Sequence, residues 1–172
     1  MLTHKDIIST IEMIDQQHLA RRGFCYVGGE YRQQNGKLLR CNQMFVEVYE
    51  PVEVTKPYPL IFMHGAGQTN MNWLVTPDGR PGWTDYFLSQ GYRVILTEQP
   101  ARARSAYHPA VNGPTTFHCA KDLALRFASD KRSWPQSKLH TQFPGNADSL
   151  DDPVMVQFIS AEVEYPWGFC LP

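Results

Sequence analysis

The spacing of apolar residues changes along the chain, and each change predicts a different element. Between residues 6 and 22 the apolar positions recur at roughly helical spacing, and Gly23 follows where a helix would end. This pattern predicts a helical lead-in over residues 1–23. Residues 24–27 and 40–49 are rich in strand-favouring side chains and flank a polar stretch, which predicts two antiparallel strands at a sheet edge.

A strand, a helix and a second strand are predicted next. Residues 60–63 are wholly apolar, as expected for a central, parallel strand covered on both faces, and a second apolar run lies at residues 94–96. Between them, residues 82–90 predict a crossover helix, in which Trp83, Tyr86 and Phe87 would share one face. Gly91 follows as a left-handed stop. This order of elements predicts an α/β fold.

The pattern becomes less regular beyond Ser105. Residues 117–129 predict a helix, residues 131–152 are polar and rich in turn-forming residues, and residues 153–163 suit either a helix or a strand. We therefore expect one incomplete domain over residues 1–172. Residues 24–108 would form its sheet core, and residues 109–172 a helix with a cap or loop region.

Composition and charge exclude several classes of function. The chain has 16 basic and 17 acidic residues and no basic stripe, so nucleic acid is not an expected partner. The 4 cysteines are far apart and the 6 histidines lack metal-ligand spacing, so we expect no metal and no other cofactor. No apolar stretch approaches the length of a membrane span, and no secretory signal is recognised. These features predict a cytoplasmic protein that does not bind a membrane.

The residues that suggest chemistry are His64-Gly65-Ala66-Gly67-Gln68, directly after the apolar run at 60–63. Glycines let the backbone turn sharply and leave N–H groups in open space, where they can stabilise the oxygen anion of an acyl transfer. Glycine turns also occur at strand-to-helix junctions without a catalytic role. The motif alone therefore leaves both interpretations open.

Residues 60–107 resemble the start of an α/β-hydrolase core, with strand, His-Gly-x-Gly loop, helix and strand in the family's order. Residues 76–92, which begin Thr-Pro-Asp-Gly-Arg-Pro-Gly-Trp, are similar to a bacterial esterase-like branch of that superfamily. The resemblance implies a partial α/β-hydrolase fold, with a mostly parallel sheet, antiparallel N-terminal edge strands and flanking helices. It further implies a serine carboxylic-ester hydrolase. The N–H groups of Ala66 and Gly67 would form its oxyanion hole together with an N–H that follows the nucleophile, and His64 and Gly65 would be structural parts of the loop.

The turn after the second strand departs from the pattern of that branch. A turn resembling Asp-x-x-Gly-x-Gly-x-Ser is expected, and Glu98, Ala101, Ala103 and Ser105 occupy its places. Two glycines have become alanine, which adopts positive φ less readily. We therefore expect the fold to persist and the geometry of this turn to be the uncertain part.

The family's nucleophile elbow, Gly-x-Ser-x-Gly, is not found, because no serine has glycine two residues away on both sides. Ser105 follows a strand at the correct edge of the sheet and is the substitute candidate. A structural role is preferred for it, because no activating base can be inferred. We expect the elbow shortly beyond Pro172, and the 172 residues alone to be inactive.

Two hypotheses follow from the resemblance. In the first, the chain is part of an esterase that acts on a small-molecule ester once the missing residues complete it. In the second, it is a catalytically inactive, truncated hydrolase that acts as a binding or interaction module. An open sheet edge would then favour a homo-oligomer or pairing with a missing C-terminal half.

Overall fold

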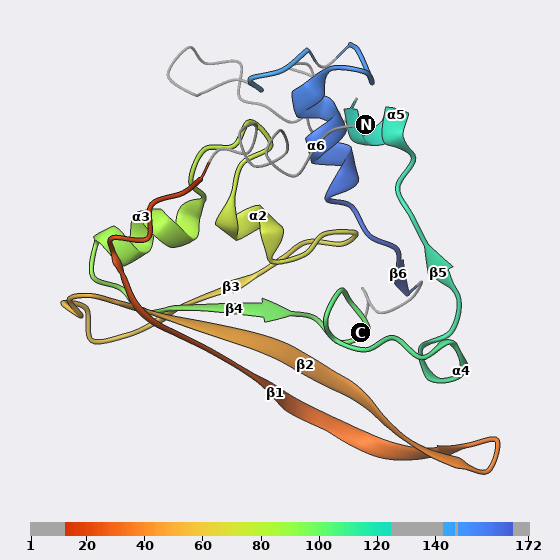
Figure 1. The fold of residues 1–172 in the computed structure, drawn as a ribbon. Coiled ribbons are helices and arrows are strands. Elements are labelled where there is room, and N and C mark those ends of the chain that lie inside the picture. The colour runs from red at the N-terminus through yellow and green to blue at the C-terminus, as the bar shows by residue number, and fades with distance from the viewer. Residues whose placement is uncertain (1–12, 125–142, 147, 167–172) are drawn as a thin grey trace, which may run out of the picture.

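A four-stranded sheet is the centre of the computed structural model, which describes residues 13–124, 143–146 and 148–166. Across the sheet the order is β1 (Leu19–Gln34), β2 (Lys37–Pro51), β4 (Val94–Glu98) and β3 (Leu60–Met63) (Figure 1). β1 pairs with β2 and β2 with β4 in antiparallel fashion, whereas β3 and β4 are parallel. The fold is α/β with antiparallel edge strands, as predicted. Within the described residues, however, the β3–β4 pair is the only parallel one.

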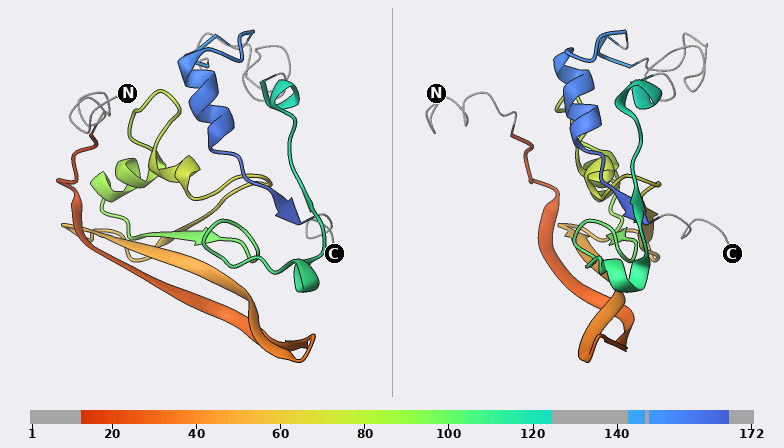
Figure 2. Two further views of the ribbon diagram at one scale, coloured as in Figure 1. Left: turned by 45° about the vertical axis from the view of Figure 1, so that its right-hand side comes forward. Right: turned by 90° about the vertical axis from the view of Figure 1, so that its right-hand side faces the viewer.

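β1 and β2 form a long hairpin that extends beyond the rest of the sheet (Figure 2). Its turn lies at Asn35 and Gly36, with φ values of 50° and 72°, and a two-residue turn with positive φ at both positions matches the twist of the flanking strands. Both strands therefore continue through the polar stretch that the sequence pattern placed between them.

The predicted helical lead-in over residues 1–23 is wrong wherever the structure describes it. Residues 13–18 contain no helix, and the segment from Leu19 onward pairs with the end of β2. Ion pairs of Arg21 with Glu50 and of Arg22 with Glu47 join the two strands. Cross-strand pairing thus overrides the local helical pattern. Residues 1–12 lie outside the described part of the chain.

The crossover helix is confirmed, and Trp83 and Tyr86 both contact Phe87 as predicted, but of these three aromatic residues only Phe87 packs against the core. α3 (Trp83–Ser89) follows the short helix α2 (Met71–Leu74), and Gly91 has a φ of 79° just beyond α3. Thr84 and Leu88 are buried, whereas Trp83 and Tyr86 are each 60% exposed. Leu88 belongs to the main core cluster, whose other buried members are Tyr49, Val94 and Leu96.

β3 is less covered than its apolar sequence predicts. Core residues of α2 and α3 pack with Phe62 on one face of the sheet, whereas Ile61 and Met63 on the other face are 64% and 56% exposed. β3 is also an edge strand of the described sheet rather than a central one. The described helices therefore bury one face of this strand and leave the other open.

The C-terminal part contains short elements around a second, two-stranded sheet. They are α4 (Pro109–Asn112), β5 (Thr115–Thr116), α5 (Ala120–Leu123), α6 (Pro153–Ser160) and β6 (Tyr165–Pro166), with β5 and β6 antiparallel. The segment that suited a helix or a strand is thus helical up to Ser160, and Asp152 caps it by accepting from the N–H groups of Val154 and Met155.

The other predictions for this region are tested only in part. The helix predicted at 117–129 begins at Ala120, and its residues 125–129 lie outside the described ranges, as do residues 131–142 of the predicted cap. Residues 143–146 and 148–152 are irregular, as predicted. Of the helices in the described ranges, none is long and apolar enough to cross a membrane.

Candidate functional site

The glycine loop at residues 64–68 follows β3 directly, at the carboxyl end of the parallel pair β3 and β4. In open α/β sheets, ligands bind beyond the carboxyl ends of the strands. Gly67 has a φ of 72°, which suits glycine, and the N–H of Gln68 donates to the carbonyl of Gly65 at 3.3 Å. Gly65 and Ala66 are exposed, so the outer side of the loop faces open space.

His64 is buried and holds the loop to the end of β4. The N–H of Gln99 donates to its Nε2 at 3.2 Å, so the ring proton lies on Nδ1, which is 2.8 Å from the carbonyl oxygen of Gly65. The side-chain amide of Gln99 donates in turn to the His64 carbonyl at 2.8 Å. Burial lowers the pKa of His64. The ring is therefore a neutral structural anchor whose two nitrogens are both engaged.

Two amide groups of the loop are unpaired in the described part of the chain, one at the exposed Ala66 and one at the buried Gly67. The planar peptide between Gly65 and Ala66 has its carbonyl held by His64, so the N–H of Ala66 is fixed on the opposite side. Within the described residues, the N–H groups of Ala66 and Gly67 form no hydrogen bond with a backbone oxygen. These neighbouring donors could therefore bind an oxygen anion.

Ser105 is placed as a structural residue. It is 0% exposed, its hydroxyl donates to the carbonyl of Glu98 at 2.7 Å, and its oxygen accepts from the N–H of Phe45 at 2.7 Å. The turn before it keeps a left-handed backbone, with φ of 60° at Ala101 and 42° at Ala103. The two alanines thus adopt the positive φ for which the related turn has glycine.

A buried ion cluster fixes this turn against the sheet. Arg104 donates to Glu98 Oε1 at 2.9 Å and to Glu47 Oε2 at 2.6 Å, and the side chains of these carboxylates are 3% and 0% exposed. Burial alone would raise the pKa of Glu47, but hydrogen bonds from Arg104 and Arg22 hold it below its ordinary value. Burial, with the Glu47 charge, raises the pKa of Tyr49 to about 12. The cluster fixes the turn to the sheet, and Glu98 also interacts electrostatically with His64 of the glycine loop.

A second polar cluster lies against the glycine loop and was missed by sequence reasoning. His118 Nδ1 is 3.1 Å from Glu162 Oε2, and the Tyr165 hydroxyl is 3.2 Å from His118 Nε2. The partners are 44 and 47 positions from His118 in sequence. No local motif joins them, because the contact is made by the pairing of β5 with β6.

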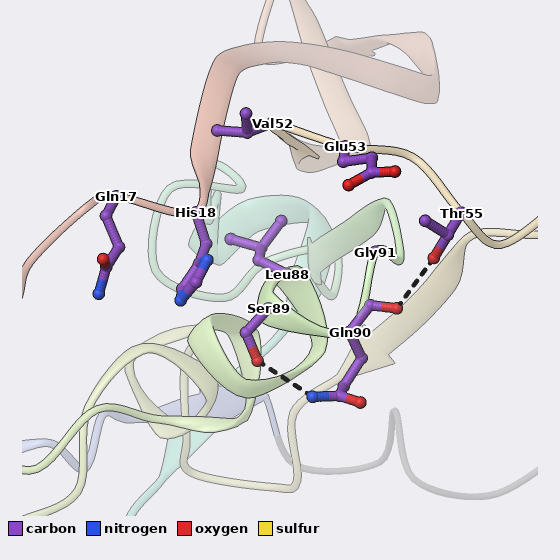
Figure 3. A pocket seen from close by; sticks show the side chains of 9 residues that line it. All are labelled: Gln17, His18, Val52, Glu53, Thr55, Leu88, Ser89, Gln90 and Gly91. Atoms are coloured by element: carbon purple, nitrogen blue, oxygen red, sulfur yellow. Dashed lines mark hydrogen bonds between the residues drawn. The ribbon is translucent and has the colours of Figure 1, made fainter.

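Two hollows lie elsewhere on the surface. The larger, of about 370 Å³, is shown in Figure 3 and is lined by Gln17, His18, Val52, Glu53, Thr55, Leu88, Ser89, Gln90 and Gly91. The other, of about 250 Å³, is lined by Tyr26, Gly28, Arg40 and Gln43. Neither contains a residue of the glycine loop. In the described part of the chain, no group of three or more His, Cys, Asp or Glu residues could hold a metal ion.

Comparison with known proteins relates the chain to hydrolases. No family model matches it. The probable secreted lipase phiG of a fungal species (strain ATCC 74256) is 44% identical over 142 residues, which cover 82% of this chain and 36% of the lipase. A solved structure, the atomic-resolution structure of a novel bacterial esterase, matches with a TM-score of 0.67 at 24% identity, over 91% of this chain and 54% of that one.

The chain is therefore related to esterase- and lipase-like hydrolases, and it has the fold of the bacterial esterase over the matched part. It spans 36% of the lipase and 54% of the esterase chain. The comparison also corrects one prediction. The expectation of a cytoplasmic protein is contradicted, because the lipase is named as a secreted protein.

Proposed function

We propose that the chain supplies the oxyanion-hole loop of a serine carboxylic-ester hydrolase that acts outside the cell. The observation that carries the proposal is the pair of unpaired N–H groups at Ala66 and Gly67, held at the carboxyl end of β3. The fungal lipase and the bacterial esterase support the reaction class, and the lipase supports the extracellular location.

In this mechanism a serine hydroxyl attacks the ester carbonyl carbon, and the carbonyl oxygen becomes an anion. The two amides donate to that oxygen, and such a donor typically contributes about 3 kcal/mol to stabilising the transition state. The His64 anchor fixes the direction of the Ala66 amide before substrate arrives, so little reorganisation is needed at the moment of reaction.

We propose that the serine and its acid–base partners come from residues other than these 172. The sequence contains no Gly-x-Ser-x-Gly, and it spans 36% of the related lipase. The exposed face of β3, with Ile61 and Met63, offers apolar surface on which further elements of the protein would pack. No observation in the described residues favours the alternative of an inactive binding module.

The test uses the full protein that carries this chain, assayed with aryl esters of short and long acyl chains. Ala66→Pro removes one amide donor, and we expect kcat to fall about 10²- to 10³-fold with KM little changed. Ala66→Ser keeps the N–H and is the matched control, with activity near that of the parent. Absence of ester hydrolysis in the parent, or full activity in a folded Ala66→Pro variant, would contradict the proposal.

Ser105→Ala provides a separate control for the nucleophile. The Ser105 hydroxyl is fully engaged between two backbone groups, so we expect a folded variant to keep its hydrolysis. Abolished hydrolysis in a variant that retains its circular dichroism spectrum and melting temperature would instead make Ser105 the nucleophile.

A further inference from the structure

The His118–Glu162 pair contacts the glycine loop at Gly67, whereas His64 holds the carbonyl of Gly65. The N–H of Val163 donates to the carbonyl of Gly67 at 2.7 Å, and the side-chain amide of Gln68 donates to Glu162 Oε1 at 3.3 Å. The chain passes from α6 to β6 at this point (Figure 1). Glu162 and Val163 thus contact Gly67 and Gln68 of the loop, although the two pairs are far apart in sequence.

The contact at position 67 is so close that a side chain there would displace His118 or Glu162. A Cβ placed on Gly67 would lie 2.5 Å from Glu162 Oε2 and 2.7 Å from His118 Nδ1. Both distances are shorter than a van der Waals contact, which shows that the carboxylate and the imidazole pack directly against the backbone of Gly67. The left-handed φ of 72° adds a second reason for glycine here.

When the imidazole of His118 is neutral, the hydrogen bonds of the pair have one arrangement. Nδ1 of His118 faces a carboxylate oxygen, which can only accept when ionised, so the Nδ1 proton points to Glu162. Nε2 then accepts from the Tyr165 hydroxyl, since a neutral imidazole has one donor and one acceptor nitrogen. Both ring nitrogens of His118 therefore have a hydrogen-bond partner, Glu162 at Nδ1 and Tyr165 at Nε2.

Anchors on both sides confine the peptide between them. His64 holds the carbonyl of Gly65, and Val163 holds the carbonyl of Gly67, so the peptides on either side of the Ala66–Gly67 peptide are fixed. With its neighbours fixed, the central peptide can rotate only by coupled changes of ψ at Ala66 and φ at Gly67, and the side chains of His118 and Glu162 pack directly on Gly67.

We propose that His118 and Glu162 are positioning residues, which hold Gly67 so that the unpaired N–H groups of the loop face the reacting carbonyl oxygen. The inference rests on the proposed function. Neither side chain contacts the substrate in this role. Their contribution is to keep the donors in place before the reaction, and this preorganisation acts on the transition state rather than on substrate binding.

The experiment compares His118→Ala, His118→Asn and His108→Ala in the full protein that carries this chain. Asn retains an N–H donor at the place of Nδ1, and is therefore the conservative variant. His108 is the matched control, since its Nε2 lies 3.1 Å from the carbonyl of Arg40, away from the glycine loop. The readouts are kcat and KM for an aryl ester, and amide hydrogen exchange of the peptide that contains residues 64–68.

For His118→Ala we expect faster exchange of the loop and a kcat lowered roughly tenfold to hundredfold, with KM little changed. His118→Asn should recover most of both, and His108→Ala should change neither. Unchanged loop exchange in His118→Ala would overturn the inference, and so would faster exchange with an unchanged kcat. If the parent hydrolyses no ester, the proposed function fails, and the exchange data alone then decide whether the pair orders the loop.

Discussion

The turn after β4 allows a direct measurement of backbone strain, because two alanines adopt a conformation that favours glycine. Ala101 and Ala103 have φ values of 60° and 42°. A left-handed conformation costs a residue with a Cβ roughly 1–2 kcal/mol, and costs glycine almost nothing. We therefore predict that Ala103→Gly raises the free energy of unfolding.

The magnitude depends on two opposing terms. Glycine makes the unfolded chain more flexible, which lowers stability by about 0.4–1 kcal/mol. Ala103 is exposed, so its methyl group contributes little packing energy. The free energy of unfolding of Ala103→Gly should therefore rise by about 0.5–1 kcal/mol. Ala101 is only 3% exposed, and loss of a buried methyl costs about 0.8 kcal/mol. That loss offsets the gain, so Ala101→Gly should be nearly neutral.

The assay is equilibrium urea unfolding, followed by circular dichroism, of the parent and three variants. The third variant, Ala110→Gly, is the control, because Ala110 is an exposed residue of α4 with negative φ. Glycine in a helix costs about 1 kcal/mol relative to alanine, so this variant should be destabilised.

The reasoning is refuted if Ala103→Gly is destabilised as much as Ala110→Gly, because position 103 would then carry no left-handed strain. A gain at Ala101 equal to that at Ala103 would show that the methyl group of Ala101 contributes no packing energy.

Two further predictions concern the buried charges and the buried histidine. Arg104→Met removes the ion pairs that Arg104 makes with Glu47 and Glu98, while Glu47 keeps its pair with Arg22, and it should lower the free energy of unfolding by about 3 kcal/mol. Arg80→Met, at an exposed pair, should cost under about 1 kcal/mol, and equal losses in urea unfolding would contradict this. Burial lowers the pKa of His64 in the folded protein below the ordinary 6.5, so the unfolded state binds the proton more readily. The neutral His64 therefore contributes stability above about pH 6.5, and this contribution is lost as pH falls through the pKa of the folded state. Urea unfolding between pH 5 and pH 7.5 should show a steeper loss for the parent than for His64→Gln, and identical slopes would refute the assignment.

Local patterns were sufficient for the elements around the glycine loop. The apolar runs at 60–63 and 94–96 are strands and residues 82–90 contain the crossover helix, since strand propensity, helical spacing and the stop at Gly91 act within a few residues. The loop at 64–68 could be predicted for the same reason. Its glycines are needed where a strand ends and the backbone turns sharply.

Local sequence patterns thus specify the order of strand, loop, helix and strand, together with the position of the glycine loop. The tertiary structure makes residues 19–23 a strand, because their pairing with β2 outweighs the helical spacing of their side chains. It also leaves Ile61 and Met63 exposed, because α2 and α3 pack on one face of the sheet. The contact of His118 and Glu162 with Gly67 likewise depends on the pairing of β5 with β6, which no local pattern encodes. Short-range physics sets elements and turns, whereas burial and long-range contacts depend on how those elements meet.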